Sequence, residues 1–253
     1  MTGKNDTRIS VTAVIQARMG STRLPGKVML DLAGRPLIAH VIERSAQIKG
    51  VDRVVLATSP EREDRSLLDL AESMNIHGFA GPRQNVLERF FLASQKYGGD
   101  YIIRVTGDNP FTDPGFAAET LQHAVTASAD LCSPLGLPLG SAVEVISRNA
   151  LEQAYNMSDR PYHREHVTPY IKEHPEQFRI HRYDAVLDNP PEDLRLTVDT
   201  REDYLLAKAI CEHFASSHVP DLEEIISFLR ENPALAAINR GIIQKPMTSA
   251  ESE

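Results

Sequence analysis

Short apolar runs of strand length alternate along this chain with longer segments that have apolar residues at helical spacing. The short runs are rich in β-branched residues, as strands are, and the longer segments repeat their apolar positions every three or four residues, as amphipathic helices do. Strands are predicted at residues 11–17, 51–58, 101–106, 129–132, 143–146 and 194–198, and helices at 36–49, 63–74, 85–97, 114–128, 148–156, 163–173, 201–214 and 222–231. This alternation predicts parallel βαβ units, and therefore an α/β fold with a mostly parallel central sheet and helices on both faces.

A polar loop with unusual chemistry follows the first predicted strand. Between residues 18 and 27 it has three cations and no acid, and its two glycines permit tight backbone turns. The cations are Arg18, Arg23 and Lys27, and the glycines are Gly20 and Gly26. Such a loop at the end of a strand is a good cradle for phosphate. An ordinary surface loop with solvated cations would have the same composition, so spacing alone leaves both interpretations open.

Two familiar phosphate-binding motifs are excluded in this loop. A Walker A motif needs four residues between its first glycine and the Gly-Lys pair, followed by serine or threonine. Here five residues separate Gly20 from Gly26, and Val28 follows Lys27. No GxGxxG pattern follows the strand, which excludes the dinucleotide fingerprint.

Two aspartates, Asp108 and Asp199, lie just after predicted strands. Ligands of open α/β sheets bind at the carboxyl ends of the strands, and Mg²⁺ takes one or two carboxylates together with water and phosphate oxygens. We therefore predict that both acids bind Mg²⁺. The alternatives are a turn at Asp108 before Pro110 and an ordinary strand-to-helix junction at Asp199. Asp113, in contrast, is predicted to cap the helix that follows it.

Composition limits the class of protein and its partners. The chain of 253 residues has 27 basic and 35 acidic side chains, and its net charge of −8 argues against nonspecific nucleic-acid binding. The polar N-terminal segment does not resemble a signal peptide, and no apolar run approaches the roughly 20 residues of a membrane span. We therefore expect a cytoplasmic protein without a membrane partner. Cys132 and Cys211, far apart in the chain, are expected to be buried free thiols.

The stretch QARMGSTRLPGK, residues 16–27, resembles the N-terminal signature of the cytidylyltransferases that make CMP-sugars. The likeness is greatest to the spore coat polysaccharide biosynthesis protein F family, which is related to the 3-deoxy-manno-octulosonate and acylneuraminate enzymes. It extends over residues 11–245 and implies one nucleotidyltransferase domain with the Rossmann-like nucleotide-diphospho-sugar transferase fold. Residues 133–190 would form an inserted substrate or dimerisation region, and the family suggests a homodimer. The ends, residues 1–10 and 246–253, are expected to be flexible.

The resemblance implies a nucleotide site built from the first loop and two later segments. Arg18, Arg23 and Lys27 would hold the triphosphate, and main-chain groups of Ala17 and Arg18 would read the base. Arg18, Lys27 and Asp108 are the predicted catalytic residues. The predicted nucleotide-binding set is Ala17, Arg18, Gly20, Ser21, Arg23, Lys27, Asn85, Arg89 and Thr106. From the residues alone, Asn85 is also a candidate helix cap, with a glutamate three residues later as in a capping box.

Two further segments resemble parts of the family that face the acceptor. In the segment GSAVEV, Glu144 matches the acid of the family pattern Gly-Leu-Asp-x-Glu-Val, whereas Ser141 and Ala142 depart from it and leave the acceptor open. Glu144 would accept hydrogen bonds from an acceptor hydroxyl or amine, or else pair with an arginine of the protein. In the segment REHVT, Arg164 and His166 would anchor an anionic substrate, because arginine can hold a carboxylate with two parallel hydrogen bonds.

The predicted activity is transfer of CMP from CTP to an acidic sugar or similar acceptor, with release of pyrophosphate, for surface polysaccharide biosynthesis. Two alternatives remain. One is a nucleotidyltransferase with another base or a non-sugar acceptor such as a phosphonate, and the other is a catalytically inactive nucleotide-binding regulator. A glycosyltransferase of similar fold is disfavoured, because those enzymes commonly use an Asp-x-Asp pair and Asn109-Pro110 follows Asp108 here.

Overall fold

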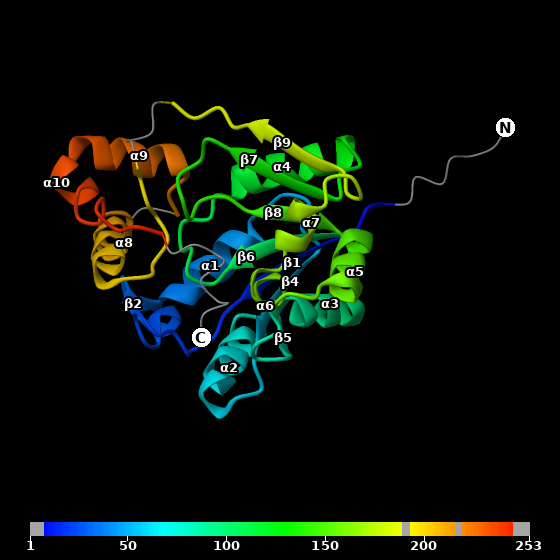
Figure 1. The fold of residues 1–253 in the computed structure, drawn as a ribbon. Coiled ribbons are helices and arrows are strands. Elements are labelled where there is room, and N and C mark those ends of the chain that lie inside the picture. Colours follow the sequence, from blue (N-terminus) through cyan, green and yellow to red (C-terminus); the bar gives the residue numbers. More distant parts are fainter. Residues whose placement is uncertain (1–7, 189–192, 216–218, 245–253) are drawn as a thin grey trace.

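The computed structural model describes residues 8–188, 193–215 and 219–244, and its centre is a seven-stranded sheet with helices around it (Figure 1). The sheet order is β5-β4-β1-β6-β8-β7-β9. Its strands are β1 (Val11–Gln16), β4 (Arg53–Thr58), β5 (His77–Ala80), β6 (Tyr101–Thr106), β7 (Leu131–Leu135), β8 (Glu144–Ser147) and β9 (Ile180–Asp184). The short strands β2 (Asp31–Leu32) and β3 (Arg35–Pro36) form a separate hairpin.

Strand direction confirms the predicted mostly parallel α/β fold. Strands β5, β4, β1 and β6 are parallel, β8 runs antiparallel to β6 and β7, and β7 pairs in parallel with β9. Because β1 is central, the five residues from Val11 to Ile15 are all buried, which explains the unbroken apolar run in the sequence. The carboxyl ends of β1 and β6 lie side by side, with Gln16 in register with Thr106.

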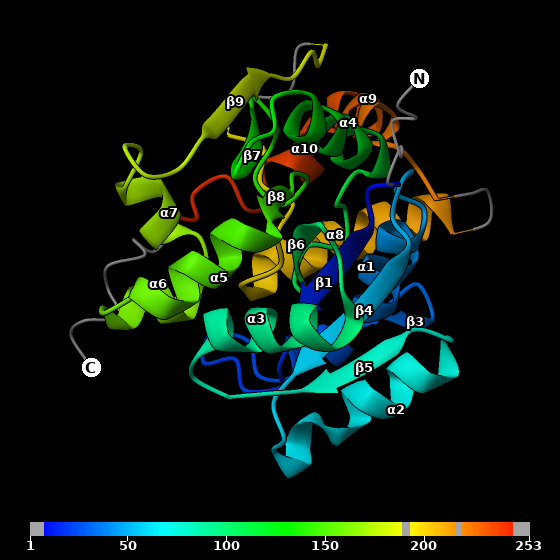
Figure 2. The same ribbon diagram turned by 90° about the vertical axis from the view of Figure 1, so that its right-hand side faces the viewer.

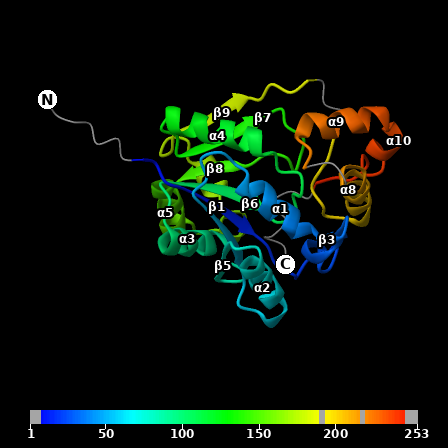
Figure 3. The same ribbon diagram turned by 180° about the vertical axis from the view of Figure 1, so that it is seen from behind.

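Helices cover both faces of the sheet. They are α1 (Leu37–Ala46), α2 (Arg65–Ser73), α3 (Val86–Tyr97), α4 (Pro114–Thr126), α5 (Arg148–Met157), α6 (Pro161–His166), α7 (Pro169–Glu173), α8 (Arg201–Phe214), α9 (Leu222–Glu231) and α10 (Pro233–Ala236). The core with Ile15 packs against α1, α4, α8 and α9, and the core with Val14 packs against α3, α5 and α7. Figure 2 shows α3, α5 and α6 along one side, and Figure 3 shows α1 and α4 across the other.

Side-chain caps begin the helices at two predicted places. The Asp113 side chain accepts a hydrogen bond from the backbone N–H of Phe116 at 2.9 Å, and Pro114 occupies the first turn of α4. The Asn85 side chain accepts from the N–H of Glu88 at 3.0 Å and caps α3. Both predicted caps are confirmed.

The predicted strand at residues 194–198 is wrong. Arg195 forms only an isolated bridge with Leu139. The N–H of Leu196 donates to the carbonyl of Leu139 at 2.7 Å, and that of Val198 donates to the carbonyl of Asp108 at 2.8 Å. The apolar pattern identified burial correctly, but the segment has no strand to pair with along its length.

Three other expectations need correction. The strands β5 and β9 were not predicted, because both are largely polar or partly exposed edge strands without a buried apolar run. The predicted helix at 163–173 is broken into α6 and α7. Val167 has a φ of 70° there, outside the right-handed helical region, and Pro169, in the first turn of α7, supplies no N–H that could continue the helix.

The predicted inserted region, 133–190, contributes β8 and β9 to the same sheet as β1. Its role in dimerisation stays a prediction.

Of the expected flexible ends, residues 1–7 and 246–253 lie outside the described residues. Within the described ranges, no helix is long and apolar enough to cross a membrane.

Both cysteines are free, Cys132 fully buried and Cys211 partly buried. Burial raises the pKa of Cys132 to about 11 and that of Cys211 to about 12. Both thiols therefore stay protonated at neutral pH and are poor nucleophiles.

Candidate active site

The first loop, residues 17–27, follows β1 and ends in Lys27, the first residue of the short helix η1 (Lys27–Met29). Its N–H groups are tied to the neighbouring strand and helix: Ala17 donates to the carbonyl of Ala57 at 3.1 Å, and Met19 donates to the carboxylate of Asp64 at 2.6 Å. Asp64 is buried and also accepts a hydrogen bond from the hydroxyl of Ser59. It is a loop-anchoring residue that the sequence did not reveal, since nothing in its local pattern indicates a contact 45 residues away.

Replacing Asp64 by alanine should loosen the first loop. We expect the free energy of unfolding to fall by about 1–3 kcal/mol, because two donors lose their acceptor, and the KM for CTP to rise. Denaturant unfolding and steady-state kinetics would measure both effects. Asp69→Ala is the matched control, since Asp69 is an exposed acid on α2. Equal values for the two variants would show that Asp64 does not hold the loop.

A turn at the end of the first loop directs Lys27 inward. The carbonyl of Met19 accepts from the N–H groups of both Ser21, at 2.9 Å, and Gly26, at 3.1 Å, and so folds the loop back on itself. Gly26 has a φ of 67°, a left-handed conformation that glycine adopts without strain. The side chain of Lys27, which follows, is only 11% exposed.

Lys27 joins the two predicted metal-binding acids. Its ammonium nitrogen Nζ lies 2.6 Å from Oδ2 of Asp108 and 2.8 Å from Oδ1 of Asp199. Nη2 of Arg23 contacts the same Oδ1 of Asp199 at 2.9 Å. The fold thus gathers two cations of the first loop and two acids from three distant parts of the chain.

Main-chain contacts bring the two acids together. Gly107 donates its N–H to the carbonyl of Gln16 at 2.8 Å, which holds the end of β6 against the end of β1. A Cβ atom at Gly107 would lie 2.8 Å from that carbonyl oxygen and 2.8 Å from Cβ of Ala17, so only glycine fits. On the other side of the cluster, Val198 donates to the carbonyl of Asp108 and places Asp199 next to it.

The electrostatics favour the charged forms of this cluster. Burial tends to lower the pKa of Lys27, but attraction to Asp108 and Asp199 outweighs burial, and the pKa is raised. Burial likewise tends to raise the pKa of Asp199, but Lys27, Arg23 and Arg195 outweigh it, and the pKa is lowered. An ammonium and a carboxylate therefore face each other at neutral pH.

The donor set suits a divalent cation that arrives with phosphate. Asp108 and Asp199 already share one cation, the ammonium of Lys27, which shows that their oxygens converge. No group of three or more His, Cys, Asp or Glu side chains that could hold a metal occurs in the part of the chain that the structure describes. Two carboxylates without a complete cage fit Mg²⁺, which fills its other positions with water and phosphate oxygens.

The remaining predicted nucleotide residues lie around the first loop. Arg18 is exposed and forms no ion pair with any residue that the structure describes. Arg89 is buried and donates from Nε to the carbonyl of Pro82 at 3.1 Å and from Nη2 to that of Arg83 at 2.9 Å. Burial, and secondarily the charge of Arg18, lowers the pKa of Arg89 to about 10. Arg89 therefore holds the loop before α3, and its contact with a nucleotide stays a prediction.

Of the three other predicted residues, Ser21 and Thr106 form hydrogen bonds within the protein. Gly20 and Ser21 belong to the first loop, and the Ser21 hydroxyl accepts from the N–H of Leu24 at 3.4 Å. Thr106 ends β6, next to Gln16 of β1, and its hydroxyl accepts a hydrogen bond from the side chain of Asn109.

Glu144 forms a charged group on the face of the sheet that α7 covers. Its Oε2 lies 2.9 Å from Nη1 of Arg104 and accepts from the Thr168 hydroxyl at 3.0 Å, and its Oε1 lies 2.5 Å from Nζ of Lys172. Burial tends to raise the pKa of Glu144, but attraction to Arg104 and Lys172 outweighs burial and lowers it. The alternative of an internal pair with arginine is therefore confirmed, and contact with an acceptor stays a prediction.

The other two predicted acceptor residues lie on α6. Arg164 is exposed and donates to the carbonyl of Ser158 at 3.4 Å, and His166 is half-buried. The junction after His166 leads directly to Thr168, which contacts Glu144. The structure thus brings the segment of Arg164 and His166 next to Glu144.

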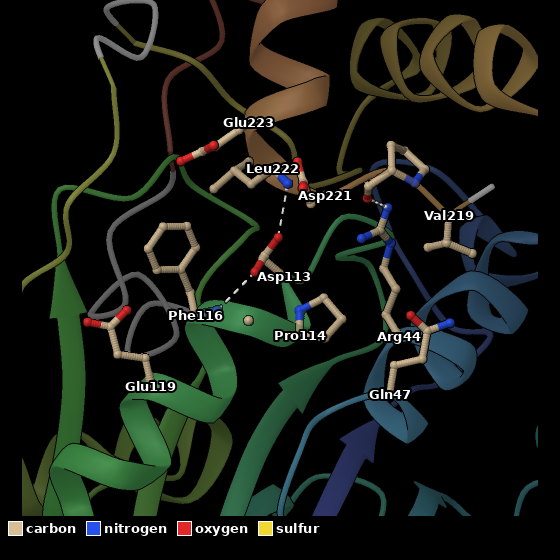
Figure 4. A pocket seen from close by; sticks show the side chains of 12 residues that line it. Arg44, Gln47, Asp113, Pro114, Phe116, Glu119, Val219, Asp221, Leu222 and Glu223 are labelled. Carbon is tan, nitrogen blue, oxygen red and sulfur yellow. Dashed lines mark hydrogen bonds between the residues drawn. The ribbon is translucent and has the colours of Figure 1, made fainter. Parts of the chain in front are cut away.

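A separate cavity of about 360 Å³ lies between α1, α4 and α9 (Figure 4). Asp113 lies at its wall, and its second oxygen, Oδ2, accepts from the N–H of Leu222 at 2.9 Å. Arg44 donates to the carbonyl of Pro220 at 2.8 Å. Both charged groups hold the start of α9 against α1 and α4, and none of the predicted nucleotide or acceptor residues lines this cavity.

Comparison with known proteins identifies the family. The sequence profile of the cytidylyltransferase family matches residues 12–238. The chain belongs to the cytidylyltransferase family. The predicted nucleotidyltransferase, with its Rossmann-like nucleotide-diphospho-sugar transferase fold, is therefore confirmed.

Individual relatives of this cytidylyltransferase support the assignment to the family. An uncharacterised protein of Methanocaldococcus jannaschii is 36% identical over 96% of this chain and 100% of its own length. The spore coat polysaccharide biosynthesis protein SpsF of Bacillus subtilis is 35% identical over 88% of this chain and 95% of its own length. A solved cytidylyltransferase of Leptospira borgpetersenii is 28% identical, with a TM-score of 0.85 over 94% of this chain and 100% of that one. The predicted likeness to the spore coat family is thus confirmed.

Proposed function

We propose that this cytidylyltransferase transfers CMP from CTP to an acceptor with an anionic group, most simply an acidic sugar destined for a surface polysaccharide. The observation that supports the proposal is the meeting of Lys27 with Asp108 and Asp199 at the carboxyl end of β6. Cations for the triphosphate and acids for its counter-ion lie within one cluster there. The likeness to SpsF supports the polysaccharide context.

The first loop would bind the triphosphate. Arg18 is exposed in this loop, and Arg23 and Lys27 would exchange carboxylate oxygens for phosphate oxygens when CTP enters. At an effective dielectric near 20 and a separation of about 4 Å, each such cation contributes about 4 kcal/mol of Coulomb attraction before desolvation is subtracted. Three cations can therefore hold the triphosphate and stabilise the charge that builds up on it.

In the reaction, a hydroxyl oxygen of the acceptor forms a bond to the α-phosphorus of CTP. The bond from that phosphorus to the bridging oxygen breaks, and pyrophosphate leaves with the electron pair. The protein's share is to hold the two reactants in line and to stabilise charge. No described side chain is an obvious general base, so the hydroxyl proton passes to solvent.

Asp108 and Asp199 are the residues that would hold a divalent cation, which we take to be Mg²⁺. When bound, the cation would draw charge from the phosphate oxygens and make the α-phosphorus a better electrophile. Asp199 would keep its charge for that purpose at neutral pH, because its neighbours lower its pKa.

Charge around Glu144 supports an anionic acceptor. Arg104 and Lys172 both contact this one carboxylate, so two cations share one acid. Two buried polar atoms on the same face of adjacent strands, Nε of Arg104 and Oε1 of Gln16, have no hydrogen-bond partner among the described residues. The spare positive charge and the unpaired N–H of Arg104, near the strand ends that hold Thr106 and Asp108, suit a ligand with a carboxylate or phosphate, whereas the unpaired oxygen of Gln16 suits a ligand hydroxyl or amine.

Pyrophosphate release tests the proposal. The protein would be incubated with Mg²⁺, each of the four nucleoside triphosphates and a panel of acidic sugars. We expect release only with CTP and an acidic sugar. Release with another nucleotide would support nucleotidyl transfer but contradict the proposed specificity for CTP. CTP binding without release from any sugar or phosphonate would favour the inactive regulator.

A further inference from the structure

The second oxygen of Asp199 is held from behind by a buried arginine. Its Oδ1 faces Lys27 and Arg23, whereas its Oδ2 lies 2.7 Å from Nη2 of Arg195. The Arg195 side chain is only 5% exposed, so it does not compete for the phosphate side of the cluster. The carboxylate of Asp199 is thus fixed at one oxygen and open to exchange at the other.

A second acid balances the charge of Arg195. Nε of Arg195 lies 2.9 Å from Oδ1 of Asp203, whose side chain is fully buried. The other oxygen of Asp203 accepts the backbone N–H groups of Asp199 and Thr200, each at 3.0 Å. Because Asp203 compensates Arg195, Arg195 can orient Asp199 without cancelling the negative charge that a cation needs.

The C-terminal segment completes this arrangement. The Asn239 side chain donates to the carbonyl of Arg195 at 2.9 Å and to Oδ1 of Asp203 at 2.8 Å, and it is buried. Oε1 of Gln244 accepts from Nη1 of Arg195 at 2.6 Å. Residues more than 40 positions downstream therefore contact Arg195, Asn239 at its backbone carbonyl and Gln244 at the guanidinium that holds Asp199.

We propose that Arg195 is a positioning residue for Asp199 and that Asn239 and Gln244, from the C-terminal segment, keep it in place. The proposal rests on the proposed function, in which Asp199 binds the cation that accompanies CTP. A carboxylate preset at one oxygen loses little freedom when its other oxygen binds a metal, and removing such a support typically weakens metal binding by about 10- to 100-fold. Arginine is needed because its planar fork reaches Asp199, Asp203 and Gln244 at once, which a single ammonium cannot do.

Calorimetric titration with manganese and CTP tests this inference. Arg195→Lys is expected to bind CTP at least about 10-fold more weakly in the presence of Mn²⁺, while its affinity for CTP in EDTA stays equal to that of the wild type. A general disturbance of the fold would weaken both. Arg240→Lys is the matched control, because Arg240 is exposed in the same segment and should leave both affinities unchanged. Wild-type affinity of a folded Arg195→Lys protein in the presence of Mn²⁺ would overturn the inference.

If Arg195→Lys does not fold, a milder variant tests whether the C-terminal segment keeps Arg195 in place. Gln244→Ala alters an exposed residue and removes one contact to Arg195. We expect about threefold weaker binding of CTP with Mn²⁺, the loss of one hydrogen bond, and again no change in EDTA. No change under either condition would overturn the role of the C-terminal segment. Wild-type protein that does not bind CTP at all would instead contradict the proposed function, so the two failures are distinguishable.

Discussion

Lys27→Ala is expected to lower kcat/KM for CTP by about 10³-fold. Lys27 would contribute about 4 kcal/mol of attraction to the triphosphate, and each 1.36 kcal/mol corresponds to a tenfold change in rate. The fold should persist, because Arg23 and Arg195 still contact Asp199 after Lys27 is removed, and Asp108 is partly exposed to water.

Steady-state pyrophosphate release with varied CTP measures this effect, and circular dichroism checks the fold. Lys49→Ala is the control, since Lys49 is an exposed lysine after α1 and far from the cluster in the sequence. Normal turnover by Lys27→Ala would remove Lys27 from the proposed phosphate site. Loss of activity in both variants would mean that charge at a distance, not contact, is responsible.

Asp108→Asn is expected to abolish the activity that depends on a divalent cation, with at least about a 10³-fold loss of kcat. The amide keeps the shape of the side chain but loses the negative charge, and a neutral oxygen is a weak ligand for Mg²⁺. The variant should also release Lys27 from one of its two ion pairs, so CTP binding in EDTA should change much less than kcat.

A titration of activity against Mg²⁺ concentration would measure the effect of Asp108→Asn. Asp113→Asn serves as the control, because both oxygens of Asp113 accept backbone N–H groups at the starts of α4 and α9. That change should cost about 1 kcal/mol of stability and leave the cation dependence as it was. If Asp108→Asn kept its activity with an unchanged demand for Mg²⁺, the cation would have to lie elsewhere.

Much of the candidate site could be predicted from the sequence, because its charged residues stand in short segments with recognisable local patterns. The first loop concentrates cations within ten residues, and Asp108 follows a clear apolar strand. The general rule that ligands bind at the carboxyl ends of strands then predicts where these groups meet. Asp199 was assigned correctly to the same place as Asp108, although the run before it is not a strand.

Other contacts had no local signal. Asp64 sits in a short helical turn, and Arg195 and Asn239 lie in segments without a motif, yet each is buried against a group 35 or more positions away. The roles of these residues depend on which distant segments of the chain lie next to them in the fold. The pairing of Arg104 with Glu144 likewise follows from the antiparallel register of β6 and β8, which no periodicity specifies.

The sequence by itself determined the alternation of strands and helices, the helix caps at Asn85 and Asp113, the cationic loop and the family signature, because propensity, burial and motif spacing are properties of neighbouring residues. The tertiary structure alone decided the edge strands β5 and β9, the break between α6 and α7, and the single bridge at Arg195. It also decided that Lys27 lies between Asp108 and Asp199, and that Arg195 holds Asp199 from behind. These features depend on contacts between distant segments, whose distances are set only when the sheet forms and its strand ends meet.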